Sequence, residues 1–416
     1  MIEWKYIKLK QLIQDIGDGG TPSTFDNGNF GGSIHWAVVD DIKPEIYTTK
    51  ETLTEKGYKK CSAKLWPVDS IILTTGATIG EVGITKIELC TKQGITGIVP
   101  NKWANNLFLR YWLENNKQQL VRYSQGTTFK EIRPRPLGNL RIKIPEPFTE
   151  ISVKTQEKIV SILSTVDKNI EQTQKTIEKT EKLKKSMMQN LLTGKIRPDG
   201  TKRKEDEFYI DDKFGKVPKG WELKFIGDSF VSIIEPNYSF KKGKQYDFLP
   251  MEAVLEKSQG ISYFSKRKIE TGGLCRFKNN DILFAKITPC TENGKIALVE
   301  KIKSELGFGS TEFIVISPSK NIISKYLYNF LLLNRIHGKA VSLMEGTTGR
   351  QRVPLSIFKK NLKICFPKDL SEQKEIVEKL EIYQNKIKVN NIKFLKLQKL
   401  KKSLMQNLLT GKIEVK

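Results

Sequence analysis

A near-identical internal repeat is the feature that most constrains the fold of this chain. Residues 182–196 read KLKKSMMQNLLTGKI and residues 399–413 read KLKKSLMQNLLTGKI, so that only Met187 and Leu404 differ. The same displacement along the chain pairs further residues of the two copies, among them Trp4 with Trp221 and Gln156 with Gln373. Repetition at one long period indicates that a structural unit occurs twice. The sequence therefore predicts a tandem duplication that extends over the whole printed chain.

The later part of each repeat carries the pattern of a long helix. Residues 150–196 and 369–416 contain few Gly or Pro residues, and apolar side chains recur along both at heptad spacing. These seams predict two long helices that pack as a coiled coil, and they also hold three polar residues: Thr173, Thr180 and Asn390. Gly194 and Gly411 follow the last apolar positions and predict where the helices stop. The alternative is a pair of ordinary amphipathic surface helices.

The remaining segments are globular in composition. Residues 1–149 and 215–368 carry short β-rich runs, Gly-rich loops and one helical stretch each, at residues 106–123 and 322–343. Such patterns predict an α+β fold, in which two mixed α/β domains alternate with the two long helices. The charged stretch at residues 197–214 predicts a solvated linker between the two copies.

Charge and cysteine usage narrow the class of protein. The chain has 71 basic and 46 acidic residues, a net charge of +25, which favours binding to nucleic acid, although a Lys-rich proteome is the alternative. Its five cysteines are scattered, which argues against a disulfide framework or a zinc knuckle and favours a reducing compartment. No signal peptide is visible and the longest apolar run, near residues 326–333, is too short to span a bilayer. We therefore predict a soluble cytoplasmic protein.

The sequence offers no convincing catalytic or metal site. It contains two histidines, His35 and His337, and neither a phosphate-binding Gly-x-x-x-x-Gly-Lys loop nor a Pro-Pro pair of the kind that amino-methyltransferases use. The letters of a nuclease signature occur at Pro198-Asp199 and Asp211-Asp212-Lys213, but without the strand pattern that would let two carboxylates share a magnesium ion. We predict no catalytic residues, no metal and no cofactor in this chain.

Candidate DNA-reading residues cluster in the loop that follows the helical stretch of each domain. Both loops contain Gly-Thr-Thr, at residues 126–128 and 346–348, followed by basic residues that differ between the copies. Base edges are read by Arg, Lys, Gln, Asn, Thr and Ser side chains on a rigid support. The candidates are therefore Thr127, Thr128, Lys130, Arg133 and Arg135 in the first domain, and Thr347, Thr348, Arg350, Gln351 and Arg352 in the second. The alternative is a solvated charged loop.

Two further kinds of loop are candidates for contacts with DNA. One follows a predicted strand in each domain, and the other reads GGTPS at residues 19–23. Small residues let the backbone approach phosphates closely, although GGTPS can also be a plain turn. The candidates are Thr21, Ser23, Thr75 and Thr78 in the first domain, and Lys286, Thr288 and Asn293 in the second.

Polar residues of the repeated helix ends indicate a partner-binding surface. Packing in a helical core requires only apolar character, yet several exposed-type residues recur unchanged in both copies. The candidates for partner binding are Lys185, Gln189 and Asn190 in the first copy, and Lys402, Gln406 and Asn407 in the second. Two copies of one partner would explain this pattern, and so would recent recombination between the repeats.

With these residues in view, the chain resembles the specificity (S) subunits of type I restriction–modification systems. The resemblance covers the whole length and rests on the order of short motifs within the duplicated frame: Gly19-Gly-Thr-Pro-Ser23, Gly76-Ala-Thr-Ile-Gly80, Gly126-Thr-Thr128, Val217-Pro-Lys-Gly-Trp221, Gly307-Phe-Gly-Ser-Thr-Glu-Phe313 and the twice-used Gln-Asn-Leu-Leu-Thr-Gly-Lys. The first domain departs from the pattern because it begins at Trp4 without the Pro-x-Gly-Trp lead-in found at residues 218–221.

The resemblance implies two target-recognition domains that each read half of a split DNA site, separated by antiparallel helices that act as a ruler. It also implies two modification (methyltransferase) subunits, which carry S-adenosylmethionine and methylate adenine. Restriction subunits would add ATP- and Mg²⁺-dependent translocation and cleavage, while the S subunit has none of these activities. The competing interpretations are an enzyme with an unfamiliar site, and a coiled-coil scaffold with no role on DNA.

Overall fold

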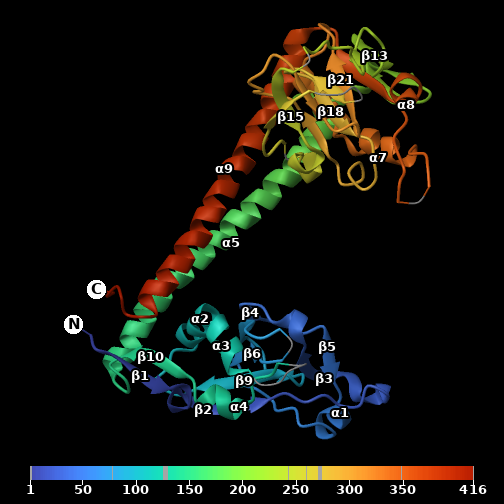
Figure 1. The fold of residues 1–416 in the computed structure, drawn as a ribbon. Helices are drawn as coiled ribbons and strands as arrows, with labels where there is room; N and C mark the ends of the chain where they lie inside the picture. The colour runs from blue at the N-terminus through green and yellow to red at the C-terminus, as the bar shows by residue number, and fades with distance from the viewer. Residues whose placement is uncertain are drawn as a thin grey trace. The chain divides into compact units, whose positions relative to one another are not determined.

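The chain folds into two compact units that each combine a globular part with halves of two long helices. The computed structural model describes residues 2–76, 78–124, 130–241, 243–258, 260–269, 274–347 and 349–415. Unit 1 comprises Met1–Lys175 and Asn391–Lys416, and unit 2 comprises Thr176–Asn390. The long helices are α5 (Glu150–Leu192) and α9 (Leu370–Leu408), and each contributes one half to each unit (Figure 1).

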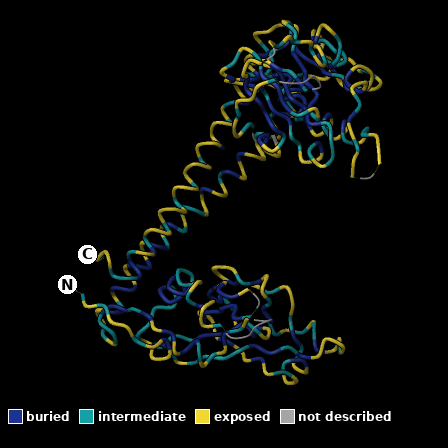
Figure 2. The backbone as a smooth tube through the Cα atoms, in the orientation of Figure 1, coloured by how far each residue is buried: buried dark blue, intermediate teal, exposed yellow. Residues whose placement is uncertain are grey.

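The globular part of unit 1 is built on a five-stranded sheet. Its strands lie in the order β2-β9-β6-β7-β4, with only the β4–β7 pair parallel. These strands are β2 (Ile13–Asp18), β4 (Glu45–Ile46), β6 (Ile71–Thr74), β7 (Val82–Thr85) and β9 (Ile95–Pro100). A second sheet has the order β5 (Glu51–Leu53), β3 (Phe30–Ala37), β8 (Cys90–Thr91), and β1 (Trp4–Lys8) pairs with β10 (Arg141–Pro145). The β6 strand is buried along its whole length, since Ile71 and Leu73 belong to one core cluster and Ile72 to another. Buried segments of the chain are dark blue in Figure 2.

Unit 2 repeats this plan with two four-stranded sheets in place of one sheet of five strands and one of three. One four-stranded sheet has the order β14 (Ser232–Ile234), β21 (Phe313–Pro318), β18 (Ile282–Ala285), β19 (Ile296–Leu298). The other has the order β16 (Ser265–Lys268), β15 (Gln245–Leu249), β20 (Gly307–Gly309), β17 (Cys275–Phe277). Two further pairs are β13 (Trp221–Phe225) with β22 (Lys363–Pro367), and β11 (Phe208–Asp211) with β12 (Gly215–Pro218). The pair β1–β10 of unit 1 corresponds to β13–β22, as the match of Trp4 with Trp221 predicts.

The helical stretch predicted in each globular part is two short helices. Unit 1 has α2 (Asn106–Asn115) and α3 (Lys117–Tyr123), and unit 2 has α6 (Ser324–Leu331) and α7 (Asn334–Ser342). The first break lies at Asn116, whose side-chain amide donates to the carbonyl of Trp112 at 2.7 Å. The second lies at Leu333, where an extended ψ of 130° lets the side chain enter the core of unit 2. The remaining short helices are α1 (Glu55–Lys59), α4 (Pro134–Gly138) and α8 (Ser356–Lys360).

The long helices pair antiparallel within each unit. In unit 1, Leu163 of α5 shares a core with Leu408 of α9, and Lys401 of α9 forms an ion pair of 3.0 Å with Asp167 of α5. In unit 2, Leu191 packs with Ile376, and the Lys184 ammonium donates to the Gln384 amide oxygen at 2.5 Å. The coiled-coil prediction is therefore confirmed. The polar seam residues Thr173 and Thr180 are buried. The hydroxyl of each donates a hydrogen bond to the backbone carbonyl four residues earlier, at 2.7 Å.

Two buried glutamines tie the start of each long helix to its own globular part. Gln156 and Gln373 are both fully buried. The side-chain oxygen of Gln156 accepts the backbone N–H of Asn105 at 2.8 Å, and that of Gln373 accepts the N–H of Ile323 at 2.9 Å. Their amide groups donate to the matching carbonyls of Trp103 at 3.0 Å and Asn321 at 3.1 Å. Gln156 and Gln373, which the repeat pairs in the sequence, therefore have the same structural role in the two units.

The segment predicted as a solvated linker is packed against unit 2. The Arg203 side chain is 9% exposed, forms an ion pair of 2.5 Å with Glu372 and lies over the Trp221 ring. Strand β11 pairs with β12, and Asp211 at its end binds Lys363 at 2.8 Å. These contacts order residues that composition alone suggests are free in solvent. None of the helices in the described ranges has the length and apolar character that a membrane crossing requires.

Candidate nucleic-acid interface

In each unit, the same backbone hydrogen bond joins the loop after the central strand to the loop after the short helices. In unit 1, the N–H of Ile132 donates to the carbonyl of Thr75 at 2.9 Å. In unit 2, the N–H of Val353 donates to the carbonyl of Lys286 at 2.8 Å. The sequence analysis identified these two loops of each domain as separate candidates for contact with DNA. The structure places them side by side.

The loop after α7 in unit 2 is closed by an isolated antiparallel β-bridge between Glu345 and Arg352, and it is called the hairpin below. Glu345 and Arg352 exchange both backbone hydrogen bonds, at 2.9 and 2.8 Å, and the N–H of Arg350 donates to the carbonyl of Thr347 at 2.9 Å. Gly346 and Gly349 have φ of 121° and 82°, in the region that favours glycine, which explains the glycines flanking the turn. Thr347 and Arg350 are exposed at its tip, Gln351 is half-buried beside them, and Thr348 lies outside the described residues.

Arg352 holds this hairpin to the body of unit 2. Its guanidinium forms two hydrogen bonds with the Glu312 carboxylate, Nε to Oε2 at 3.0 Å and Nη2 to Oε1 at 2.8 Å. These bonds lower the pKa of Glu312. Bidentate pairs of this kind fix geometry as well as supplying attraction. Arg352 therefore helps to hold its neighbours Arg350 and Gln351 in place, and its partner Glu312 is a residue of this candidate surface that sequence reasoning missed.

The strand-following loop of unit 2 supports the hairpin. The N–H of Thr288 donates to the carbonyl of Gln351 at 3.1 Å, and the Thr288 hydroxyl donates to Glu292 at 2.9 Å. The side-chain amide of Asn293 donates to Glu256 at 2.9 Å. Lys286 is half-buried. Thr288 and Asn293 thus have protein partners on this surface, and contact with DNA requires that they exchange or share them.

In unit 1, the predicted residues divide into exposed and buried sets. Lys130, Arg133, Arg135 and Thr78 are exposed, while Thr127 and Thr128 lie outside the described residues. Thr75 is fully buried and its hydroxyl lies 3.0 Å from that of Thr96. The Thr75 side chain is therefore not available to DNA in this structure, and its backbone carbonyl is the part that joins the two loops.

The glycines before Thr21 and Ser23 serve backbone packing. A Cβ atom on Gly19 would lie 2.2 Å from the Lys92 carbonyl oxygen, and one on Gly20 would lie 2.3 Å from the Ala63 nitrogen. The glycines are therefore explained by contact with the chain itself rather than with a phosphate. Ser23 is exposed and Thr21 half-buried, where the Thr21 hydroxyl accepts the N–H of Gln93 at 3.4 Å.

The two long helices end in the same geometry. Gly194 and Gly411 have φ of 67° and 68°. Beyond each of them the chain turns back, since the carbonyl of Asn190 accepts the N–H of Lys195 at 2.9 Å and that of Asn407 accepts the N–H of Lys412 at 3.0 Å. The repeated residues are presented alike: Lys185, Lys402, Gln189 and Gln406 are exposed, and Asn190 and Asn407 are half-buried.

Metal ligands, cysteines and histidines were the remaining candidates for a chemical site. No three His, Cys, Asp or Glu residues within it are placed to hold a metal ion, and the five cysteines are free. His35 lies 3.1 Å from the Thr49 hydroxyl and His337 lies 2.8 Å from the Thr291 carbonyl. Asp211 stands at the end of a strand, contrary to the sequence analysis, but it is paired with Lys363.

Comparison with known proteins gives one family. A family model described as "Type I restriction modification DNA specificity domain" matches residues 1–182 and 218–400. The MjaIX specificity subunit of Methanocaldococcus jannaschii is 27% identical over 430 residues, covering 99% of this chain and 94% of that protein. The EcoAI specificity subunit of Escherichia coli is 34% identical over 178 residues, covering 41% of this chain and 29% of that protein.

A solved structure has the same fold. The S subunit of the type I restriction–modification system from M. genitalium superposes with a TM-score of 0.58, covering 98% of this chain and 96% of that one. Sequence identity across this superposition is 14%, so the likeness concerns the fold alone.

Proposed function

Because the chain belongs to the family of type I restriction–modification DNA specificity subunits, we propose that each of its two globular parts reads one half of a split DNA target. The chain has a DNA sequence-specificity role and contains two tandem recognition domains. One observation carries the assignment of the reading surface: the same backbone bond, Ile132 to Thr75 in unit 1 and Val353 to Lys286 in unit 2, holds loops whose basic residues differ.

Two domains that recognise different DNA sequences need the same backbone support but different side chains on it. Specific base contacts come from side chains that a rigid support holds against the edges of the bases. In unit 2 that support is the hairpin held by Glu312, with Arg350 and Gln351 beside it. In unit 1 the exposed basic residues around the same bond are Lys130, which stands two positions before Ile132 as Gln351 stands before Val353, and Arg133 and Arg135 at the start of α4.

Mapping of methylated bases tests this assignment. We expect Arg350→Ala with Gln351→Ala to relax recognition in one half of the target only, since a good base contact contributes about 1–3 kcal/mol of discrimination. Replacement of Lys130, Arg133 and Arg135 by Ala is the variant for the other half. The readout is single-molecule sequencing of DNA methylated by the complete complex. Equal loss in both halves from either variant would show that these residues supply only general affinity.

We propose further that this subunit performs no chemistry of its own. Methyl transfer would belong to two modification subunits that carry S-adenosylmethionine, and ATP- and Mg²⁺-dependent steps to restriction subunits. Family membership supports this division of labour. Incubation of the pure chain with DNA, Mg²⁺ and labelled S-adenosylmethionine should transfer no label and leave the DNA uncut, and addition of modification subunits should start transfer. Label transfer by the chain alone would refute the proposal.

The matching helix ends support a docking role. Two modification subunits would each contact one end, through Lys185 and Gln189 of α5 or Lys402 and Gln406 of α9. The support for this proposal is that identical side chains are exposed in identical backbone geometry at both ends.

A further inference from the structure

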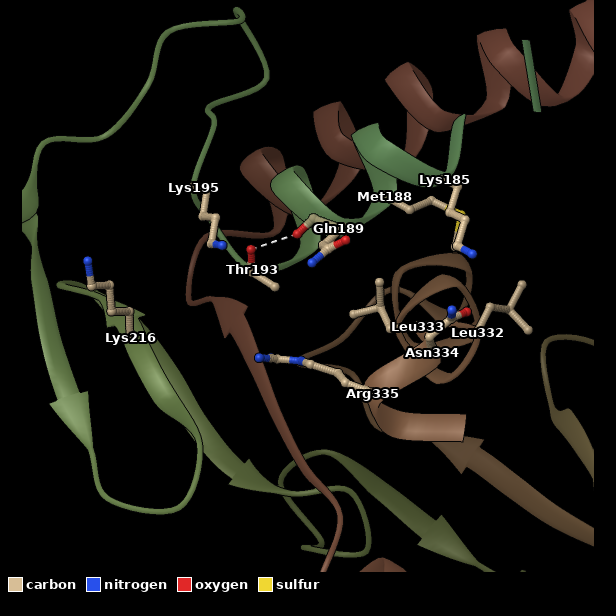
Figure 3. Close-up of a pocket in the computed structure, with 10 residues that line it drawn as sticks. All are labelled: Lys185, Met188, Gln189, Thr193, Lys195, Lys216, Leu332, Leu333, Asn334 and Arg335. Atoms are coloured by element: carbon tan, nitrogen blue, oxygen red, sulfur yellow. Dashed lines mark hydrogen bonds between the residues drawn. The ribbon is translucent and has the colours of Figure 1, made fainter. Parts of the chain in front are cut away.

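A pocket of about 530 Å³ opens beside the end of α5 in unit 2 (Figure 3). Its walls come from the last turns of α5, from the turn that joins α6 to α7, and from Lys195 and Lys216. Four of its ten lining residues are cationic, three are large apolar residues and none is acidic: Lys185, Lys195, Lys216, Arg335; Met188, Leu332, Leu333; Gln189, Thr193 and Asn334. An apolar floor with a cationic rim is therefore built at one of the two helix ends.

Most of the positive charge at this rim is available to a partner. Lys216 is paired with Glu205, whereas Lys185 and Lys195 are exposed and, among the described residues, have no carboxylate within 4.0 Å. Arg335 also has no carboxylate partner there, but burial of its guanidinium lowers the pKa of that group. The Arg335 guanidinium lies 4.0 Å from the Phe214 ring centre, which keeps its side chain extended at the edge of the pocket. A phosphate backbone would meet the cations but could not fill the apolar floor. A protein segment with an apolar side chain flanked by carboxylates matches both features.

The corresponding place in unit 1 is built differently. The turn between the short helices reads Glu114-Asn-Asn-Lys117 in unit 1 and Leu332-Leu-Asn-Arg335 in unit 2. Glu114 is held by Lys401 at 2.8 Å and by Arg110 at 3.0 Å, and Lys117 is paired with Glu81 at 2.5 Å. Unit 1 therefore has a carboxylate where unit 2 has leucine. The helix ends are alike, but their surroundings are not.

We propose that the pocket of unit 2 anchors an apolar side chain flanked by acidic residues on the modification subunit, and that the two docking sites of this chain are consequently unequal. Unit 2 binds its modification subunit more tightly than unit 1 does. This inference rests on the proposed docking function and adds to it the chemistry of the partner segment and an order of assembly.

Titration of the full chain with purified modification subunit tests the inference, by calorimetry for affinity and native mass spectrometry for stoichiometry. We expect two binding steps of different affinity. Leu332→Glu, which gives unit 2 the carboxylate of unit 1, should weaken the tighter step more than about tenfold, because the carboxylate would be buried against an apolar group. Lys185→Glu, at an exposed position, should weaken the same step roughly five- to tenfold.

Lys402→Glu is the matched control, because Lys402 is the repeat equivalent of Lys185. It should weaken only the other step. The inference would be overturned if the two binding steps had equal affinity and if Leu332→Glu and Lys185→Glu weakened binding no more than Lys402→Glu does. The docking function would remain intact in that case. If neither lysine variant changes binding of the modification subunit, the docking function itself fails.

The remaining alternative is that the rim of the pocket binds DNA. Binding of a short DNA duplex to the chain alone tests it. Loss of duplex binding in Lys185→Glu, with binding of the modification subunit unchanged, would assign the pocket rim to DNA and overturn the inference. Circular dichroism checks that Leu332→Glu is folded, and the exposed Lys185→Glu variant keeps the test decisive if it is not.

Discussion

Glu312 and Arg352 form an ion pair that holds the hairpin proposed as the reading surface of unit 2. The pKa of Glu312 is lowered chiefly by hydrogen bonds from Arg352. A carboxyl with a lowered pKa stabilises the fold above its ordinary pKa, and this contribution disappears as the pH falls through the lowered value. The hairpin at residues 345–352 should therefore be held more firmly at neutral than at acidic pH.

Glu312→Gln tests this at the level of a single residue. At pH 7 we expect faster hydrogen exchange of the Arg352 amide, because the neutral side chain can no longer form the ion pair that holds the hairpin. The difference from the unchanged chain should shrink as the pH falls through the lowered pKa of Glu312, where the native carboxyl also becomes protonated. Glu345→Gln, an exposed carboxylate on the same hairpin, serves as the control and should leave exchange unchanged. A difference that persists undiminished at low pH would assign the effect to packing.

Single residues were also where the sequence was least informative. Gly19 and Gly20 are needed because backbone approaches backbone, but a glycine in a sequence does not reveal what approaches it. Thr75 belongs to a residue type that contacts DNA, yet its position directly after a buried strand places it inside the sheet. The role of Glu312 depends on a contact 40 residues away, and no local pattern indicates it.

At the scale of elements, the buried glutamines give the sharpest expectation. Gln156→Ala removes the acceptor of the Asn105 amide and leaves buried polar groups without partners, which should cost about 1–3 kcal/mol locally. Hydrogen exchange of Asn105 should accelerate while that of Ile323 stays the same. Gln373→Ala should give the reverse result, so each variant is the control for the other. Acceleration at both sites in one variant would show that the two units do not open independently.

The long elements were predictable because their pattern is sustained. Heptad seams identify α5 and α9, and Gly194 and Gly411 mark their ends, since a left-handed residue closes each helix. The break at Leu333 could not be predicted in the same way, because it follows from burial of that side chain in the core of unit 2 rather than from a helix-breaking residue. Packing of the linker through Arg203 is likewise a tertiary effect.

At the scale of the whole molecule, the repeat in the sequence is not the unit in space. Each compact unit takes its globular part from one repeat and its helix halves from both. Antiparallel packing explains this, because the start of α5 finds its apolar partner at the end of α9, and the start of α9 finds its partner at the end of α5. The duplication predicts two similar units. Which segments of the chain make up each unit follows only from the antiparallel direction in which the helices pair.

Continuity of α5 and α9 through both units leads to the proposal that their length sets the spacer of the DNA target. Four residues inserted between Lys175 and Thr176, and four between Asn390 and Asn391, would lengthen both helices by about 6 Å at 1.5 Å per residue. Four residues rotate the following part of a helix by about 40° more than one full turn. We therefore expect the apolar heptad seam to be disturbed only near the insertion and to continue in register beyond it. With a rise of about 3.4 Å per base pair, we expect the spacer to grow by one or two base pairs while both half-sites keep their sequences. Methylation mapping reads out both quantities. An unchanged spacer would show that the helices do not measure distance, and an altered half-site would show that they contact the reading loops.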